Sequence, residues 1–136
     1  MATSAAITQG AHHIGLTVPN VSAARNFFVE ALGFSEVGGK PDYPAVFVSD
    51  GSVVLTLWQA IDPESSVPFD RKNNVGLHHL ALKVDSLATL NSLYETLSAL
   101  ANVEIEFSPE SMGGGPSEHF IVYIPGGIRL EFVAKP

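Results

Sequence analysis

Two pairs of adjacent histidines stand at matching places in the chain and supply four of its five histidines. His12 and His13 open the segment HHIGLTV, and His78 and His79 open the similar segment HHLALKV. Neutral imidazole is the commonest metal ligand in proteins, and its pKa also suits proton transfer near neutral pH. A single His-His pair at a strand end is often only a solvated polar pair. The repetition is what favours a metal site.

The composition excludes several classes of protein. A chain of 136 residues fits one well-buried domain. The net charge is −7, and seven Lys and Arg residues do not supply the cationic face that nucleic acid requires. No apolar run is long enough for a bilayer span, and the N-terminal segment lacks the features of a signal peptide. Because the chain has no cysteine, disulfides, thiolate metal sites and cysteine nucleophiles are excluded. We expect a cytoplasmic protein.

The elements that position the first histidine pair follow from periodicity. Alternation in HHIGLTV predicts a strand, and residues 21–33 have the apolar spacing of a helix. Two β-branched runs around Asp50-Gly51 predict a hairpin, with room for a further short strand at 35–38. The first half therefore has the order β-α-β-β-β.

The second half repeats this order after a polar stretch, residues 61–75, that we interpret as a linker. The elements expected there are a strand at 77–84, a helix at 86–102, a short strand at 103–107, a loop at 108–118 and a hairpin at 119–134. An internal repeat of this kind strongly constrains the fold. We predict an α+β fold of two tandem β-α-β-β-β modules, residues 11–60 and 76–134, forming one domain.

The alternation of strand side chains indicates which histidine of each pair faces the binding surface. Successive side chains on a strand point to opposite faces. Ile14 and Leu16 suit a core covered by the helix, so His13 faces away from that core. The same argument places His79 and Glu131 on the face opposite the core. Two histidines and a carboxylate on one concave surface form a ligand set for a divalent metal.

Other residues near this surface have two interpretations each. His119 could act as an acid or base, or it could be a strand-end histidine near solvent. Arg129 could hold a substrate anion or pair with a carboxylate, and the second interpretation is favoured. His12 and His78 lie on the wrong face by alternation, which leaves them a supporting or rim role.

The two modules, with HHIGLTV, GLHHLALKV and PGGIRLEFV, resemble the vicinal oxygen chelate superfamily. This group includes glyoxalase I, bleomycin- and fosfomycin-resistance proteins, methylmalonyl-CoA epimerase and extradiol dioxygenases. The resemblance covers residues 11–134. It implies a cupped, mixed eight-stranded sheet with helices outside, closed around one divalent metal that His13, His79 and Glu131 would hold. Mn²⁺, Fe²⁺, Co²⁺, Ni²⁺ and Zn²⁺ all suit such ligands.

The sequence departs from the superfamily pattern at one ligand position. Several members, glyoxalase I among them, take a fourth ligand, usually Glu or Gln, from the last strand of the first module. That position holds Thr56 or, with the alignment anchored on the preceding turn, Leu55. Neither is an ordinary ligand, so Thr56 is at most a substrate contact. Three ligands leave positions open for two substrate oxygens, which resembles the dioxygenase and fosfomycin-type arrangements more than glyoxalase I.

Two classes of function follow. The preferred one is a metal-dependent lyase, dioxygenase or transferase acting on a small oxygen-rich molecule. The alternative is a metal-free antibiotic-binding protein of the bleomycin-resistance type, which should be acidic and lined by aromatic residues. The chain is acidic, but few aromatic residues are expected to face the cup. An inactive member that retains the ligands is a third, weaker alternative. The resemblance also implies a homodimer in which each site takes His13 from one subunit and His79 and Glu131 from the other.

Overall fold

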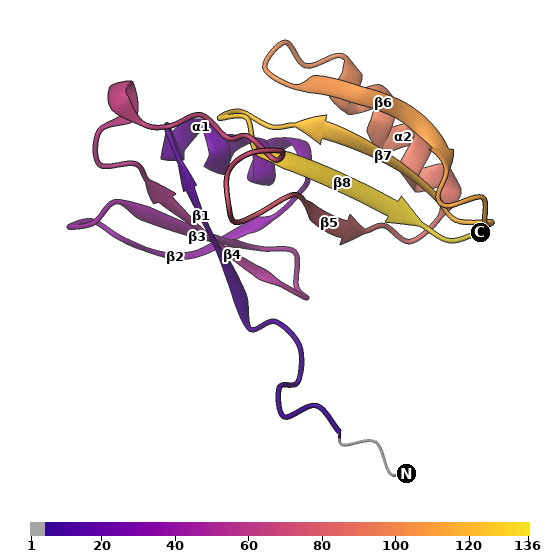
Figure 1. The fold of residues 1–136 in the computed structure, drawn as a ribbon, viewed down its shortest axis with the longest axis horizontal. Helices are drawn as coiled ribbons and strands as arrows, with labels where there is room; N and C mark the ends of the chain where they lie inside the picture. Colours follow the sequence, from indigo (N-terminus) through magenta and orange to yellow (C-terminus); the bar gives the residue numbers. More distant parts are fainter. Residues whose placement is uncertain (1–4) are drawn as a thin grey trace.

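The computed structural model describes residues 5–136, which form two four-stranded mixed sheets with helices on one side (Figure 1). The first sheet has the strand order β1 (His13–Val18), β4 (Val54–Gln59), β3 (Ala45–Ser49) and β2 (Ser35–Lys40). The second sheet has the order β5 (Leu80–Lys83), β8 (Arg129–Ala134), β7 (Glu118–Tyr123) and β6 (Glu104–Ser111). The sheets repeat one plan, because β1–β4 and β5–β8 are parallel and the other pairs are antiparallel.

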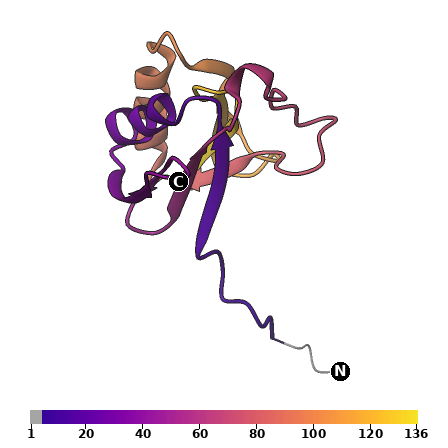
Figure 2. The same ribbon diagram turned by 90° about the vertical axis from the view of Figure 1, so that its left-hand side faces the viewer.

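The helices begin at side-chain caps that the sequence supplies. α1 (Val21–Asn26) starts at Asn20, whose side chain accepts the Ala23 N–H, and continues as a wider π-helical turn, η1 (Phe27–Ala31). α2 (Leu87–Ser98) starts at Ser86, whose hydroxyl accepts the Thr89 N–H at 3.1 Å. Such caps satisfy backbone donors that the helix itself leaves free. Figure 2 shows both helices on the same side of the molecule.

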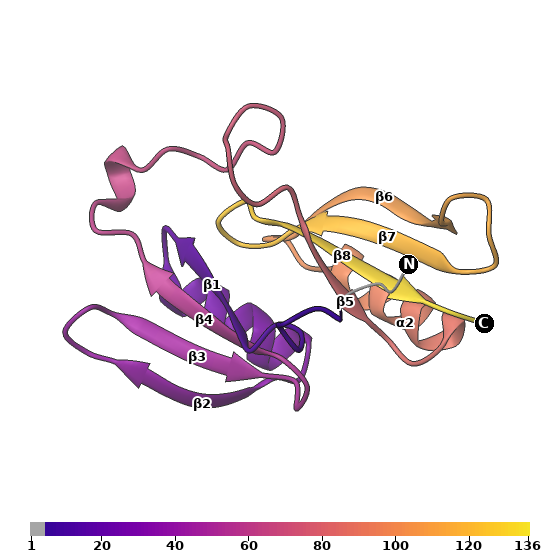
Figure 3. The ribbon, with the colours of Figure 1, turned by 60° about the horizontal axis from the view of Figure 1, so that its bottom comes forward.

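One hydrophobic core connects the two halves. Phe28 beside α1 and Leu90 and Leu97 on α2 are fully buried, and they belong to a single cluster that includes the inward-facing residues of both sheets. Leu16 and Leu82 are buried on this side, as the alternation predicts. The helices therefore do not cover the opposite faces of the two sheets (Figure 2). Figure 3 shows the sheets next to each other, joined by the long connection between β4 and β5, which contains the short 3-10 helix η2 (Pro63–Ser65).

The predicted α+β class with eight strands is confirmed, and three details differ. The strands form two separate sheets, and within residues 5–136 no ladder joins them into one closed sheet. The loop predicted at 108–118 is wrong at its start, because β6 continues to Ser111 through two irregularities in its pairing with β7. β5 begins at Leu80, so His78 and His79 precede the strand. Among the described residues, no helix is long and apolar enough to cross a membrane.

Candidate metal centre

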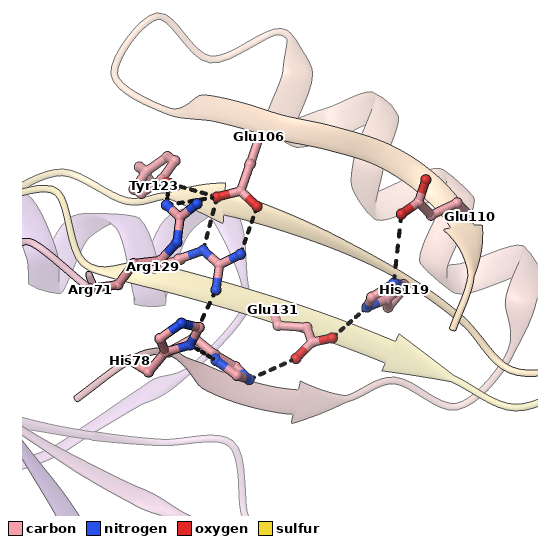
Figure 4. A network of polar contacts seen from close by, with 9 residues as sticks. Arg71, His78, Glu106, Glu110, His119, Tyr123, Arg129 and Glu131 are labelled. Atoms are coloured by element: carbon pink, nitrogen blue, oxygen red, sulfur yellow. Dashed lines mark hydrogen bonds and ion pairs between the residues drawn. The ribbon is translucent and has the colours of Figure 1, made fainter. Parts of the chain in front are cut away.

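Glu131 lies between two histidines on the open face of the second sheet (Figure 4). Its Oε1 atom is 3.2 Å from Nε2 of His79, and its Oε2 atom is 2.5 Å from Nδ1 of His119. β8 places Glu131 directly opposite Ala81 of β5, whose small side chain leaves the carboxylate room. The Glu131 side chain is only 5% exposed, whereas that of His79 is 36% exposed. One carboxylate thus contacts a different histidine through each oxygen.

The spacing of His79 and Glu131 fits a shared divalent cation. Ligand bonds of about 2.1 Å to an imidazole nitrogen and a carboxylate oxygen would span this separation of 3.2 Å at an angle of about 100°. Nitrogen and oxygen ligands of this kind suit first-row divalent metals. The two side chains therefore fit the metal that the superfamily resemblance implies, as two of its ligands.

The structure does not bring His13 to this pair. His13 starts β1 in the first sheet, where its Nδ1 atom is 2.9 Å from Nδ1 of His12. Among the residues that the structure describes, no three His, Asp or Glu side chains come close enough to hold a metal ion. A single chain therefore offers two of the three expected ligands at one place.

The register of the parallel strands identifies the counterpart of Glu131 in the first sheet. Gly15 of β1 is opposite Thr56 of β4, just as Ala81 of β5 is opposite Glu131 of β8. Thr56, rather than Leu55, therefore occupies the equivalent position. Thr56 is a buried residue, and its hydroxyl accepts a hydrogen bond of 2.9 Å from Nε1 of Trp58.

Aromatic side chains gather on the same face as Thr56. Phe47 of β3 is directly opposite Thr56, and Trp58 follows two residues later on β4, so both side chains share its face. The Trp58 ring lies 6.0 Å from that of Phe47 and 4.8 Å from that of Tyr43. The open face of the first sheet is thus more aromatic than the sequence led us to expect.

Arg129, which is buried, belongs to a partly buried polar cluster whose other members the sequence did not indicate (Figure 4). Its Nε and Nη2 atoms donate to the two carboxylate oxygens of Glu106, at 2.8 and 2.7 Å. Tyr123 also donates to Glu106, at 2.6 Å, and Arg71 lies 3.3 Å from the same oxygen while donating to the Tyr123 hydroxyl. The fork of Arg129 is therefore occupied by a carboxylate of its own chain.

These contacts shift the pKa values of the residues in the cluster. The Arg129 guanidinium, which donates two hydrogen bonds, lowers the pKa of Glu106 to about 2. The Glu106 carboxylate in turn raises the pKa of Arg129, whereas burial, together with the hydrogen bond to Glu106, raises the pKa of Tyr123. Only Arg129 and Tyr123, which pair across β8 and β7, could have been placed together from sequence. Glu106 lies within a strand irregularity, between Ile105 and Phe107, and Arg71 belongs to the connection between the sheets.

His119 is held on both sides of its ring. Nδ1 contacts Glu131, Nε2 lies 3.9 Å from Oε1 of Glu110, and the ring packs edge-on against Phe107 with centroids 5.0 Å apart. Its side chain is 17% exposed. A histidine whose Nδ1–H is fixed by a carboxylate can accept a proton at Nε2, which is the arrangement that acid–base catalysis uses.

One cavity lies apart from the His79–Glu131 pair. It has a volume of about 410 Å³ and lies between the end of β1 and the connection to β5, with Thr17, Phe69, Leu77 and Ile128 among its lining residues. Neither His79 nor Glu131 lines it.

Comparisons with known proteins assign the chain to a class. The model of the Glyoxalase/Bleomycin resistance protein/Dioxygenase superfamily matches residues 10–132, and the chain belongs to this superfamily. The glyoxylase/bleomycin resistance protein/dioxygenase domain from Frankia sp. EAN1pec has a similar fold, with a TM-score of 0.78 and 22% identity over 95% of this chain and 93% of that one. The fosfomycin resistance protein FosX from Listeria monocytogenes matches with a TM-score of 0.74 and 18% identity, over 96% of each chain.

Two similar curated proteins are epimerases. The 2-epi-5-epi-valiolone epimerase of Actinomyces sp is 26% identical over 92% of this chain and 79% of its own length. The mitochondrial methylmalonyl-CoA epimerase of Bos taurus is 31% identical over 56% of this chain, a match that covers 47% of that protein. These relatives are enzymes by name, and they differ from one another in substrate.

Proposed function

We propose that this protein is a metal-dependent enzyme that binds a small substrate through adjacent oxygen atoms at a site formed by His13, His79 and Glu131. The observation that carries the proposal is the separation of 3.2 Å between Nε2 of His79 and Oε1 of Glu131, which suits two ligands of one cation. The metal would be Mn²⁺, Fe²⁺, Co²⁺, Ni²⁺ or Zn²⁺.

Each side chain has a distinct task in this proposal. A divalent cation at this place would stabilise negative charge that develops on adjacent substrate oxygens. Glu131 offers Oε1 to the cation and uses Oε2 to orient His119. His119 would then give or take a proton at Nε2. Thr56 is not an ordinary metal ligand, so the fourth ligand position would stay open for the substrate. The Thr56 hydroxyl would then contact the substrate. The guanidinium of Arg129 is already bound by Glu106, so the proposal assigns Arg129 no contact with a substrate anion.

Among possible reactions, the relatives favour epimerisation, in which a proton leaves one face of a carbon atom next to a carbonyl group and returns to the other. The curated matches named epimerases support this choice. Dioxygenase-type and fosfomycin-resistance-type reactions are the other candidates, because a set of three ligands leaves room for two substrate oxygens. The identity of the metal separates the dioxygenase-type reaction from the other two, since activation of oxygen requires a redox-active ion such as iron.

We further propose that the site is completed by a second copy of the chain, with His13 from one subunit and His79 and Glu131 from its partner. The placement of His13 on a different sheet from the other two residues supports this arrangement. It can be tested by mixing His13→Ala and His79→Ala variants under conditions that exchange subunits. Random pairing would restore metal binding at about one quarter of the sites, because half of the dimers would be mixed and each would contain one intact site. No recovery would mean that the site is not shared between subunits.

The direct test of the proposed function is the metal content of protein purified without a chelator or a histidine tag. We expect about one divalent ion per chain by mass spectrometry, because a dimer would contain two shared sites. The His79→Ala variant should lose that ion. Circular dichroism of the variant verifies that it folds. No metal, and no uptake of Mn²⁺, Fe²⁺, Ni²⁺ or Zn²⁺ on titration, would contradict the proposal.

A second candidate is a metal-free binding protein of the bleomycin-resistance type. The aromatic cluster of Tyr43, Phe47 and Trp58, together with the net charge of −7, favours it as a receptor for a cationic aromatic ligand. Absence of metal uptake, combined with quenching of the Trp58 fluorescence by such a ligand, would support this function over the enzymatic one.

A further inference from the structure

Both histidine pairs make the same unusual contact between ring nitrogens. Nδ1 of His12 is 2.9 Å from Nδ1 of His13, and Nδ1 of His78 is 2.8 Å from Nδ1 of His79. A hydrogen bond between two imidazole rings requires one nitrogen to donate and the other to accept. The direction of this bond therefore determines which ring nitrogen of each neutral histidine retains a free lone pair.

In the second pair, a neighbouring arginine determines the direction. Glu106 holds the guanidinium of Arg129 through Nε and Nη2, which leaves Nη1 aimed at Nδ1 of His78, 3.4 Å away (Figure 4). A guanidinium can only donate, so Nδ1 of His78 accepts. The hydrogen in the contact of 2.8 Å then belongs to Nδ1 of His79.

The other side of the His79 ring agrees with this direction. Its Nε2 atom is 3.2 Å from Oε1 of Glu131, longer than the roughly 2.7–2.9 Å of a charge-assisted hydrogen bond. The Nδ1 atom of His119, by contrast, approaches the other oxygen of the same carboxylate to 2.5 Å. The short contact of His79 is thus at Nδ1 and the long one at Nε2.

We propose that His78 and Arg129 are positioning residues that hold neutral His79 as its Nδ1–H tautomer and so keep Nε2 free as the metal-binding atom. This inference rests on the proposed metal site. Without the His78 acceptor, the carboxylate of Glu131 would favour a hydrogen on Nε2, because hydrogen bonds to charged acceptors are the stronger ones. That hydrogen would occupy the position that the cation needs.

The first pair provides a matched control. His13 is directly opposite Val54 in the parallel register of β1 and β4. The corresponding neighbour in the second sheet is Arg129, because Leu80 is opposite Leu130 and His79 and Arg129 precede them. The first pair therefore has an apolar side chain where the second pair has a guanidinium. Because the first pair belongs to the other sheet, a change at His12 should not affect the tautomer of His79.

The test uses the tautomer of His79 in the metal-free protein of 136 residues, observed by two-bond ¹H–¹⁵N correlation NMR at alkaline pH, where imidazole is neutral. His79→Gln identifies its signals. His78→Leu removes the acceptor, whereas His78→Asn restores one, because its amide oxygen can accept from both His79 and Arg129. His78 is exposed, so these variants should fold, unlike changes at the buried Arg129.

We expect the Nδ1–H tautomer in the wild type, in His78→Asn and in the control His12→Leu, and a shift to Nε2–H in His78→Leu. An Nε2–H tautomer in the wild type, or no change in His78→Leu, would overturn the proposal. Zn²⁺ titration adds a second readout, in which His78→Leu should bind about tenfold more weakly and His78→Asn close to the wild type.

The two measurements separate this inference from the proposed function. If the tautomer responds as expected but neither the wild type nor any variant takes up Mn²⁺, Fe²⁺, Ni²⁺ or Zn²⁺, the control of the tautomer stands and the metal site is refuted. If Zn²⁺ binds equally well to the wild type and to His78→Leu with an unchanged tautomer, the metal site stands and the positioning role is refuted.

Discussion

The ion pair between Glu106 and Arg129 should make a large and pH-dependent contribution to stability. Two hydrogen bonds from Arg129 hold the pKa of Glu106 well below its ordinary value of 4.5, at about 2. This difference corresponds to about 3 kcal/mol, at about 1.4 kcal/mol per pH unit. The Glu106 side chain is 22% exposed, so water screens part of the interaction and about 2–3 kcal/mol is the expected contribution.

The direction of the pH dependence follows from the lowered pKa. The folded protein binds the Glu106 proton more weakly than the unfolded chain, so the contribution is fully present above about pH 4.5 and is lost as the pH falls toward 2. Glu106→Gln should therefore lower the free energy of unfolding by about 2–3 kcal/mol at pH 7. The difference from the wild type should fall to less than about half of that at pH 3, because Glu106 is then protonated in the unfolded chain while it is still largely ionised in the folded protein.

Urea denaturation at a series of pH values, followed by circular dichroism, measures both quantities. Glu36→Gln is the matched control, because Glu36 pairs with Arg25 at 2.9 Å on the surface, where the side chains are 49% and 34% exposed. That variant should lose less than about 1 kcal/mol. If Glu106→Gln loses no more than Glu36→Gln, or if its difference from the wild type is the same at pH 3 and pH 7, the reasoning is refuted.

Two further substitutions test local packing. Gly15→Ala would place Cβ 3.1 Å from Oγ1 of Thr56 and 3.6 Å from Nε1 of Trp58, so we expect a loss of about 1 kcal/mol and a shift in the fluorescence of the single tryptophan. Unchanged emission and stability would show that the two side chains move aside freely. Ser86→Ala removes the acceptor of the Thr89 N–H and should cost about 1 kcal/mol in urea denaturation, whereas Ser86→Asp should retain most of the stability.

Periodicity predicted the fold wherever the strands are regular. Leu16 on β1 and Leu82 on β5 are buried while their neighbours face outward, because a two-residue period survives in an undistorted strand. The end of β6 was not predicted, since its pairing with β7 shifts between Ile105 and Phe107 and again between Phe107 and Glu110. Each shift breaks the period on which the prediction depends.

The candidate site was predictable only in part, for related reasons. His79 and Glu131 follow from alternation on strands that the repeat had already identified, and the structure brings them together. Glu106 lies within one of the shifts in the pairing of β6, and Arg71 belongs to a connection that has no period. The contact of Glu131 with His119 requires the antiparallel register of β7 and β8, which the turn alone does not determine.

The two sheets have the same strand plan but differ at the positions that bear on chemistry. By register, Ala45, Val54 and Thr56 of the first sheet correspond to His119, Arg129 and Glu131 of the second. The first sheet thus contributes His13 and an aromatic face, and the second half contributes Glu131 with His79 and His119 on either side of it. Two first sheets facing each other would provide histidines without Glu131, and two second sheets would bring two carboxylates together. Only a first sheet facing a second sheet can bring His13 to His79 and Glu131. Since a single chain does not bring them together among the described residues, the proposed site takes unlike halves from two chains.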